Sequence, residues 1–155
     1  MQNDIESNLF SNKGTKILYS QKIFYKKKVK FSNRKFSEIN FYSRNFKTNK
    51  NYNLVKIEMC IPFTGLDTAE KRARIVAYID NEVICDLTIH TPKKWLLRPI
   101  YISGFSLNVN EGKHRFKIKA CVESGNLYIP YVESGFFKKP EEPKKFCSLL
   151  ITGIN

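Results

Sequence analysis

Hydrophobic residues recur at every second position over most of the chain after residue 54. The first run consists of Val55, Ile57, Met59 and Ile61. Since successive side chains of a strand point to opposite faces, such a run predicts a strand with one buried face. Pro62 is expected to end this strand, because it has no backbone N–H for a neighbouring strand.

Two pairs of such runs are joined by turn residues and therefore predict hairpins. The first pair consists of Ala73, Ile75, Ala77 and Ile79 and, after Asp80-Asn81, of Val83, Cys85, Leu87 and Ile89. The second consists of Phe105, Leu107 and Val109 and, after Asn110-Glu111-Gly112, of His114, Phe116, Ile118, Ala120 and Val122. Further strands are expected at Leu127 to Tyr131 and at Phe146 to Ile151. The pattern predicts an all-β fold, an antiparallel β-sandwich of the jelly-roll-like kind.

Helical signals are sparse. The segment from Asp67 to Arg72 has an N-cap acid followed by Glu70 three residues later. This capping pattern predicts one or two helical turns in a connection between strands.

Composition divides the chain near residue 53. Residues 1–53 hold 12 Lys and Arg against 3 acids, together with ten of the 21 aromatic residues, whereas residues 54–155 hold every proline and every cysteine. Burial is the one large gain that aromatic rings offer, so these residues are not expected to form a disordered tail. We predict an extended, basic, aromatic-rich N-terminal arm over 1–53 and the sandwich domain over 54–155, the arm laying its rings on its own sandwich or on a partner.

Charge and cysteine usage limit the class of protein. The net charge is +13 and 42% of residues are hydrophobic, which fits a folded protein that is attracted to polyanions. No apolar run approaches the roughly 20 residues that a spanning helix needs. The first residues lack a secretory or transit pattern, and the four cysteines stand far apart without a Cys-x-x-Cys pair. We therefore expect no metal site and no cofactor, and a reducing location that is cytoplasmic or assembly-associated rather than secreted.

Basic and aromatic residues interleave from Lys16 to Lys47, which is the strongest functional signal. Lysines neutralise phosphates or carboxylates, while rings stack on bases or fill grooves. The candidate residues for binding a partner or polyanion are Lys16, Lys22, Lys26, Lys27, Lys28, Lys30, Arg34, Lys35, Arg44, Tyr25, Phe31 and Phe36. The alternative is an amphipathic strand pair, with the rings in the core and the lysines in water.

Catalytic patterns are absent from the sequence, so no catalytic residue is assigned and the chain is not expected to be an enzyme. Asp86 and His90 would lie on the order of 13 Å apart along a strand, too far to act as a dyad. His114 is in phase with Phe116 and is expected to be a hydrogen-bonded, half-buried ring. No nucleophile elbow, phosphate-binding glycine loop or His-Glu-x-x-His motif occurs.

A small-ligand or glycan site is a weaker candidate. Trp95 is the sole tryptophan and lies in a connection, where it serves either as a platform for a sugar or partner, or as a cap on the sandwich. The turns around Asp80 and Asn126 complete this candidate ligand-binding set.

Residues 74–130 carry a resemblance to known β modules. The segment Val76-Ala77-Tyr78-Ile79-Asp80-Asn81-Glu82-Val83 is followed by Ile102 to Ile118, with a glycine and an alternating strand. This order resembles jelly-roll sandwiches such as PA14-like and carbohydrate-binding modules, and its closing strands are similar to the C1q and tumour-necrosis-factor type. The resemblance implies the fold. In the sugar-binding relatives acids or calcium ligands precede the first hairpin, whereas Arg72 and Arg74 precede it here.

The leading functional hypothesis is a non-enzymatic structural or interaction protein docked into a large assembly through its basic aromatic arm. The acidic surface is expected on a capsid, a microtubule-like lattice or a ribonucleoprotein. Binding to nucleic acid itself is the first alternative, and glycan or ligand binding is the second.

Overall fold

The computed structural model describes residues 14–25, 27–131 and 146–155, and most of these residues lie in β-strands. The strands in this part of the chain are β1 (Thr15–Phe24), β2 (Lys30–Phe31), β3 (Ser37–Glu38), β4 (Arg44–Thr48), β5 (Tyr52–Leu66), β6 (Lys71–Ile79), β7 (Glu82–Thr91), β8 (Arg98–Val109), β9 (Gly112–Val122), β10 (Leu127–Tyr128) and β11 (Phe146–Ile154). One turn of 3-10 helix, η1 (Asn40–Tyr42), separates β3 from β4.

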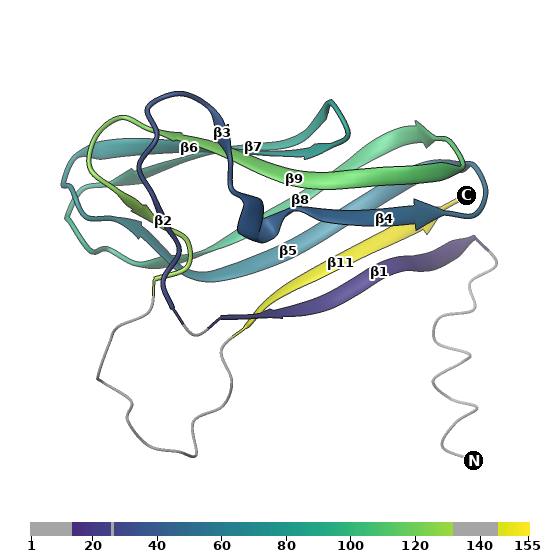
Figure 1. The fold of residues 1–155 in the computed structure, drawn as a ribbon, viewed down its shortest axis with the longest axis horizontal. Helices are drawn as coiled ribbons and strands as arrows, with labels where there is room; N and C mark the ends of the chain where they lie inside the picture. Colours follow the sequence, from purple (N-terminus) through teal and green to yellow (C-terminus); the bar gives the residue numbers. More distant parts are fainter. Residues whose placement is uncertain (1–13, 26, 132–145) are drawn as a thin grey trace, which may run out of the picture.

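The strands form two antiparallel sheets packed face to face (Figure 1). The first, named the β5 sheet, has the order β1-β11-β5-β10-β2, and β8 also pairs with β5. The second, named the β9 sheet, has the order β3-β9-β6-β7, and β4 also pairs with β9. The predicted all-β antiparallel sandwich is confirmed.

Alternate side chains of both sheets meet in one core, as the period-two pattern predicts. On β5 the buried positions are Val55, Ile57, Met59 and Ile61, and on β9 they are Phe116, Ile118, Ala120 and Val122. All eight belong to the same buried cluster. The clean alternation along these two strands therefore identified the core face of each sheet.

The first predicted hairpin is confirmed and the second is wrong. β6 and β7 pair around Asp80 and Asn81, and Asp80 has the positive φ, 53°, that this turn requires. β8, in contrast, pairs with β5, whereas β9 pairs with β6 in the other sheet. The turn at Asn110-Glu111 thus crosses between the sheets. A turn motif alone does not distinguish a hairpin from such a crossing.

The facing of β8 also differs from the prediction. Phe105 and Leu107 are 54% and 56% exposed, while Ser106 between them is buried. Ser106 donates a hydrogen bond to the Glu82 carboxylate, which satisfies its hydroxyl inside the fold. Alternation predicted a strand here correctly but placed Phe105 and Leu107 on the wrong face, whereas Val109 is buried as expected.

Two other local predictions are corrected. β5 does not end at Pro62 but continues to Leu66, with an irregularity in its pairing with β8 between Ile61 and Thr64. This break in register accommodates a residue that cannot donate to the ladder. The segment from Asp67 to Arg72 forms a tight turn and the start of β6 rather than a helix, because its backbone is engaged by neighbouring strand ends.

The division into an arm and a sandwich requires correction. Over the described residues up to 53, β1 pairs with β11, β2 with β10, and β3 and β4 with β9. Tyr42 is fully buried, and its hydroxyl donates to the carbonyl of Ile129. The basic aromatic segment is therefore part of both sheets, because its rings gain more from burial in the shared core than from exposure.

The two long sides of the sandwich are closed differently. On one side β7 lies against β8, and a Cβ placed on Gly104 would stand 2.0 Å from the carbonyl oxygen of Ile84. On the other side β1 and β4 are the outer strands of their sheets, and no backbone pairing joins them over their described residues. A side-chain bond from Arg44 Nε to Gln21 Oε1, 2.7 Å long, bridges this open edge.

Candidate polyanion-binding face

The basic residues predicted as a partner site fall into separate groups, on β1, on β4 and around β2. Lys16 and Lys22 are exposed on β1, and Arg44 lies half-buried on β4. The other exposed members lie around β2, namely Lys27, Lys28, Lys30, Arg34 and Lys35. Arg34 is held in place by bonds from Nη1 to the carbonyls of Ser32 and Gly125. Lys26 lies outside the described residues.

Two of the three predicted stacking rings cannot reach a ligand. Tyr25 and Phe31 are 6% and 8% exposed and belong to the core, which corrects their assignment as partner-binding residues. Burial is also the main cause that raises the pKa of Tyr25 to about 12. Phe36 is 42% exposed, and the guanidinium of Arg74 stands 5.2 Å from its ring centroid. Phe36 alone of the three rings is available at the surface.

The residues of the predicted ligand site do not meet. Trp95 packs its ring against those of Tyr128 and Tyr131, with centroids 5.2 and 5.3 Å apart. Asn126 lies at the same end of the fold, while Asp80 follows the other end of the nine-residue strand β6, roughly 30 Å away at the usual rise. This placement favours the sandwich cap over the sugar platform for Trp95.

Asn126 has a structural partner. Its backbone N–H and its Nδ2 donate to the two oxygens of Asp67, at 2.7 and 2.6 Å. Burial alone would raise the pKa of Asp67, but the hydrogen bonds from Asn126 and Thr68 outweigh it and lower that pKa. The pair therefore fixes the turn before β6 to the turn before β10.

A different set of cations gathers on the outer face of the β9 sheet. We name it the basic strip, and its members are Lys47, Lys113, Arg115, Lys117 and Lys119. The pairing register places Lys47 opposite Lys113, and Asn45 opposite Arg115. Four of these cations, all but Lys47, lie on β9, where they alternate with residues that point into the core. Packing of the core residues therefore places all four cations on the outer face.

Most of the basic strip has no acidic partner within the described residues. Arg115 pairs with Glu38 at 2.5 Å, whereas the four lysines make no ion pair there. The bond from Ser43 and then that from Arg115 lower the pKa of Glu38, and the charge of Lys117 lowers it further, so its carboxylate remains charged. Glu38 also stands opposite Lys119 in the pairing of β3 with β9. One carboxylate among these five cations leaves the basic strip with a net positive charge, which attracts an external anion.

Aromatic rings lie beside the basic strip. Lys117 and Lys119 place their Nζ atoms 5.6 and 5.4 Å from the ring centroid of Tyr78, which lies on the adjacent strand β6. The Phe36 and Arg74 contact lies in the same sheet region, and Arg74 is paired with Asp86. Two of the predicted basic residues also stand beside rings, since Lys22 Nζ lies 4.8 Å from the ring centroid of Phe146 and Lys28 Nζ lies 5.1 Å from that of Tyr128.

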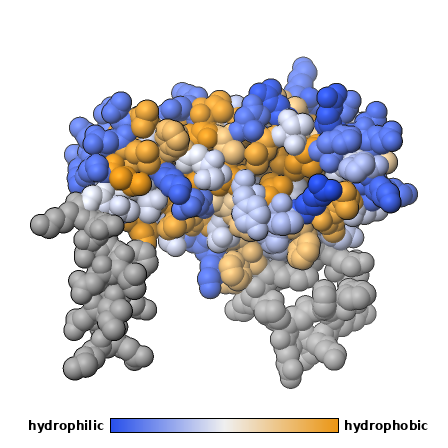
Figure 2. Space-filling view, turned by 180° about the vertical axis from the view of Figure 1, so that it is seen from behind, coloured by the Kyte–Doolittle hydropathy of each residue, from blue (hydrophilic) through white to orange (hydrophobic). Residues whose placement is uncertain are grey.

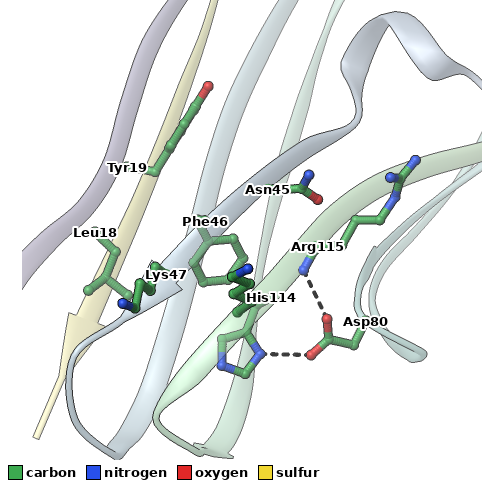
Figure 3. Close-up of a pocket in the computed structure, with 9 residues that line it drawn as sticks. Leu18, Tyr19, Asn45, Phe46, Lys47, Asp80, His114 and Arg115 are labelled. Carbon is green, nitrogen blue, oxygen red and sulfur yellow. Dashed lines mark hydrogen bonds and ion pairs between the residues drawn. The ribbon is translucent and has the colours of Figure 1, made fainter.

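A groove opens at the end of the basic strip, beside the open edge (Figure 3). Its volume is about 680 Å³, and it is lined by Leu18, Tyr19, Asn45, Phe46, Lys47, Asp80, Lys113, His114 and Arg115. His114 confirms the expected hydrogen-bonded, half-buried ring: Nδ1 lies 2.8 Å from Asp80 Oδ2, and Nε2 lies 2.8 Å from the carbonyl oxygen of Asn110. Both ring nitrogens thus face oxygen atoms of the protein.

The opposite outer face carries large apolar side chains around the Lys56–Glu58 ion pair. Figure 2 shows hydrophobic side chains across the middle of the side seen from behind Figure 1, with hydrophilic ones toward both ends. Six large side chains on β1, β8 and β11 are more than a third exposed: Ile17, Phe24, Tyr101, Phe105, Leu107 and Phe146. Exposed apolar groups gathered on one sheet are typical of a contact surface.

Sequence reasoning missed the basic strip although a signal was present. Arg115, Lys117 and Lys119 alternate with core residues along β9, but this alternation was used only to predict a strand. The excess of basic over acidic residues is largest in residues 1–53, and it predicted the partner site there. The contribution of Lys47 depends on pairing between distant strands, which no local pattern reveals.

Neither a metal-binding cluster nor a membrane-spanning helix occurs among the described residues. No group of three His, Cys, Asp or Glu side chains that could hold a metal ion occurs among residues 14–25, 27–131 and 146–155. In that part of the chain no helix is long and apolar enough to cross a membrane.

Comparison with known proteins gives only distant likenesses. No family model and no curated protein matches the sequence. A structure of the infectious bursal disease virus Gx strain is similar over 90% of this chain and 32% of that chain, at 8% identity and a TM-score of 0.45. The VP2 subviral particle of the same virus is similar over 90% and 37%, at 7% identity and a TM-score of 0.42.

A family two carbohydrate esterase from Cellvibrio japonicus is also similar, over 84% of this chain and 45% of that chain, at 11% identity and a TM-score of 0.20. The chain spans about a third of the length of the two viral chains. At such identities and scores these likenesses carry no argument about what the chain binds or does.

Proposed function

We propose that this chain is a non-enzymatic interaction protein that docks on an acidic macromolecular surface, as a component of a larger assembly in a reducing compartment. The observation that carries the proposal is the row of four lysines on β4 and β9 that make no ion pair in the described residues, although Glu38 lies beside them. The packed sheet holds the backbone of these strands in place, so docking must order the lysine side chains but little backbone.

Three further observations support the proposal. The apolar outer face of the β5 sheet offers a second contact surface of different chemistry. His114, the ring in the groove, has both nitrogens facing oxygen atoms of the protein, which argues against general-base chemistry there. The four cysteines are free, as a reducing compartment maintains them.

The test uses polyglutamate as a probe of an acidic protein surface, with affinity followed by fluorescence anisotropy at rising salt. Lys117→Gln with Lys119→Gln is expected to weaken binding about three- to tenfold at low salt, because two unpaired charges leave the basic strip. The matched control is Lys93→Gln with Lys94→Gln, which removes the same charge from an exposed connection. Equal losses in the two double variants would mean that binding follows net charge and not the basic strip.

Nucleic acid is the second candidate partner, and Tyr78 between Lys117 and Lys119 is the observation that favours it. Rings beside cations let bases stack while phosphates are neutralised. An oligothymidylate probe separates the two candidates. Tyr78→Leu is expected to weaken oligothymidylate binding and to leave polyglutamate binding unchanged if nucleic acid is the partner, whereas an unchanged affinity for oligothymidylate removes this candidate.

A further inference from the structure

The groove at the open edge differs from the basic strip because it combines charge with an apolar interior. Phe46 and His114 lie beneath it, with ring centroids 5.4 Å apart and planes inclined by 32°, and Phe46 itself is only 5% exposed. Leu18 and Tyr19 of β1 form the wall on the β5 sheet side (Figure 3). An apolar side chain would find ring surfaces and aliphatic carbon here, which the flat outer face of β9 does not provide.

The rim of the groove is positive. Lys47, Lys113 and Arg115 line it from β4 and β9. Its one acidic residue, Asp80, is already engaged, since Oδ2 faces His114 Nδ1 and Oδ1 accepts the backbone N–H of Arg115. The lysines remain without an acidic partner among the described residues, so the rim is complementary to carboxylates.

The position of the groove favours an extended ligand. It lies where β1 and β4 are the outer strands of their sheets, whereas the opposite side of the sandwich is filled by the contact of β7 with β8. β4 has five residues, so a segment of about five extended residues would run beside it.

We propose that this groove binds an extended acidic segment of a partner protein that carries an apolar side chain between carboxylates. The carboxylates pair with Lys47 and Lys113, and the apolar side chain packs on Leu18 and Tyr19. The inference rests on the proposed docking function and names the part of the partner that the groove selects.

The test compares two peptides of equal charge, N-acetylated and C-amidated: Glu-Glu-Leu-Glu-Glu and Glu-Glu-Gly-Glu-Glu. The leucine peptide is expected to bind about fivefold more tightly or better, because its side chain buries apolar area that glycine lacks. In nitrogen-edited NMR spectra the leucine peptide is expected to shift the amide signals of Phe46 and His114. Equal affinities for the two peptides overturn the groove proposal and leave docking by the basic strip intact.

Variants separate the groove from the rest of the basic strip. Lys47→Gln with Lys113→Gln is expected to reduce the affinity for the leucine peptide about tenfold, since both rim lysines are lost. Lys117→Gln with Lys119→Gln should preserve the preference for leucine over glycine, because these lysines lie outside the groove. Loss of that preference in the second variant and not in the first would overturn the assignment. Failure of polyglutamate to bind the unmodified protein would instead overturn the proposed function itself.

Discussion

The two long edges of the sandwich are built from the same kind of strand but have different roles. At the β7 and β8 edge the sheets touch, since Gly104 lets β8 reach the backbone of Ile84 and Ser106 bonds to Glu82. At the β1 and β4 edge they remain apart, and a groove and lysines occupy the space. The comparison indicates that one edge holds the sandwich together, which leaves the other free to carry a binding surface.

Among the variants considered, Gly104→Val is expected to have the largest effect on stability, because it disrupts the closed edge. A Cβ at this position would stand 2.0 Å from the Ile84 carbonyl oxygen, and no rotamer relieves this clash because the backbone fixes where the Cβ lies. We expect a loss of about 3 kcal/mol or more in the free energy of unfolding, measured with urea. Ser103→Val is the matched control, because Ser103 is exposed on the same strand and should change stability little. Equal stability of the two variants would show that the closed edge does not hold the sheets together.

Tyr42→Phe tests how η1, which leads into β4, is held in the core, and its expected effect is smaller. The change removes the hydroxyl that donates to the buried carbonyl of Ile129, and an unsatisfied buried group costs about 1–3 kcal/mol. Tyr101→Phe is the control, since Tyr101 is 68% exposed. Urea unfolding should give a clearly lower free energy of unfolding for Tyr42→Phe than for Tyr101→Phe. If both variants match the unmodified protein, η1 is not anchored in the core as described.

The smallest expected effect on stability is that of the charge on Glu38. Its pKa is lowered by the bonds from Ser43 and Arg115, so ionised Glu38 stabilises the fold above its ordinary value of 4.5, and this contribution is lost as the pH falls below that value. Because the pair lies near the surface, the contribution is expected to be below about 1 kcal/mol.

The measurement for Glu38 is urea unfolding of the protein and of Glu38→Gln at pH 7 and at pH 3. The variant should be the less stable protein at pH 7, and the difference should shrink at pH 3. A constant difference would show that the charge of Glu38 is not what Ser43 and Arg115 stabilise.

The sequence predicts strands better than it predicts their partners. Alternation over β5, β6 and β9 identified their core faces, because the period of two is a local property of the backbone. It failed at Phe105 and Leu107, where an apolar outer face and the buried Ser106 reverse the usual rule. It also failed to show that β8 and β9 belong to different sheets, since pairing is decided by distant segments.

The candidate site was predicted in kind but not in place. A basic surface with rings was expected within residues 16–47, where the net charge is concentrated, yet Tyr25 and Phe31 supply the core. The basic strip draws most of its cations from β9, where they alternate with core residues. Burial decides which rings and charges of a segment face water, and the burial of a strand depends on the strands that cover it.

A backbone chemical-shift map of the protein titrated with polyglutamate tests the central claim most directly. The account predicts that the shifts cluster on β4 and β9, from Lys47 across Lys113 to Lys119, and that they disappear at high salt. Shifts centred on Lys27 to Lys35 around β2, or spread evenly over all exposed lysines, would contradict it.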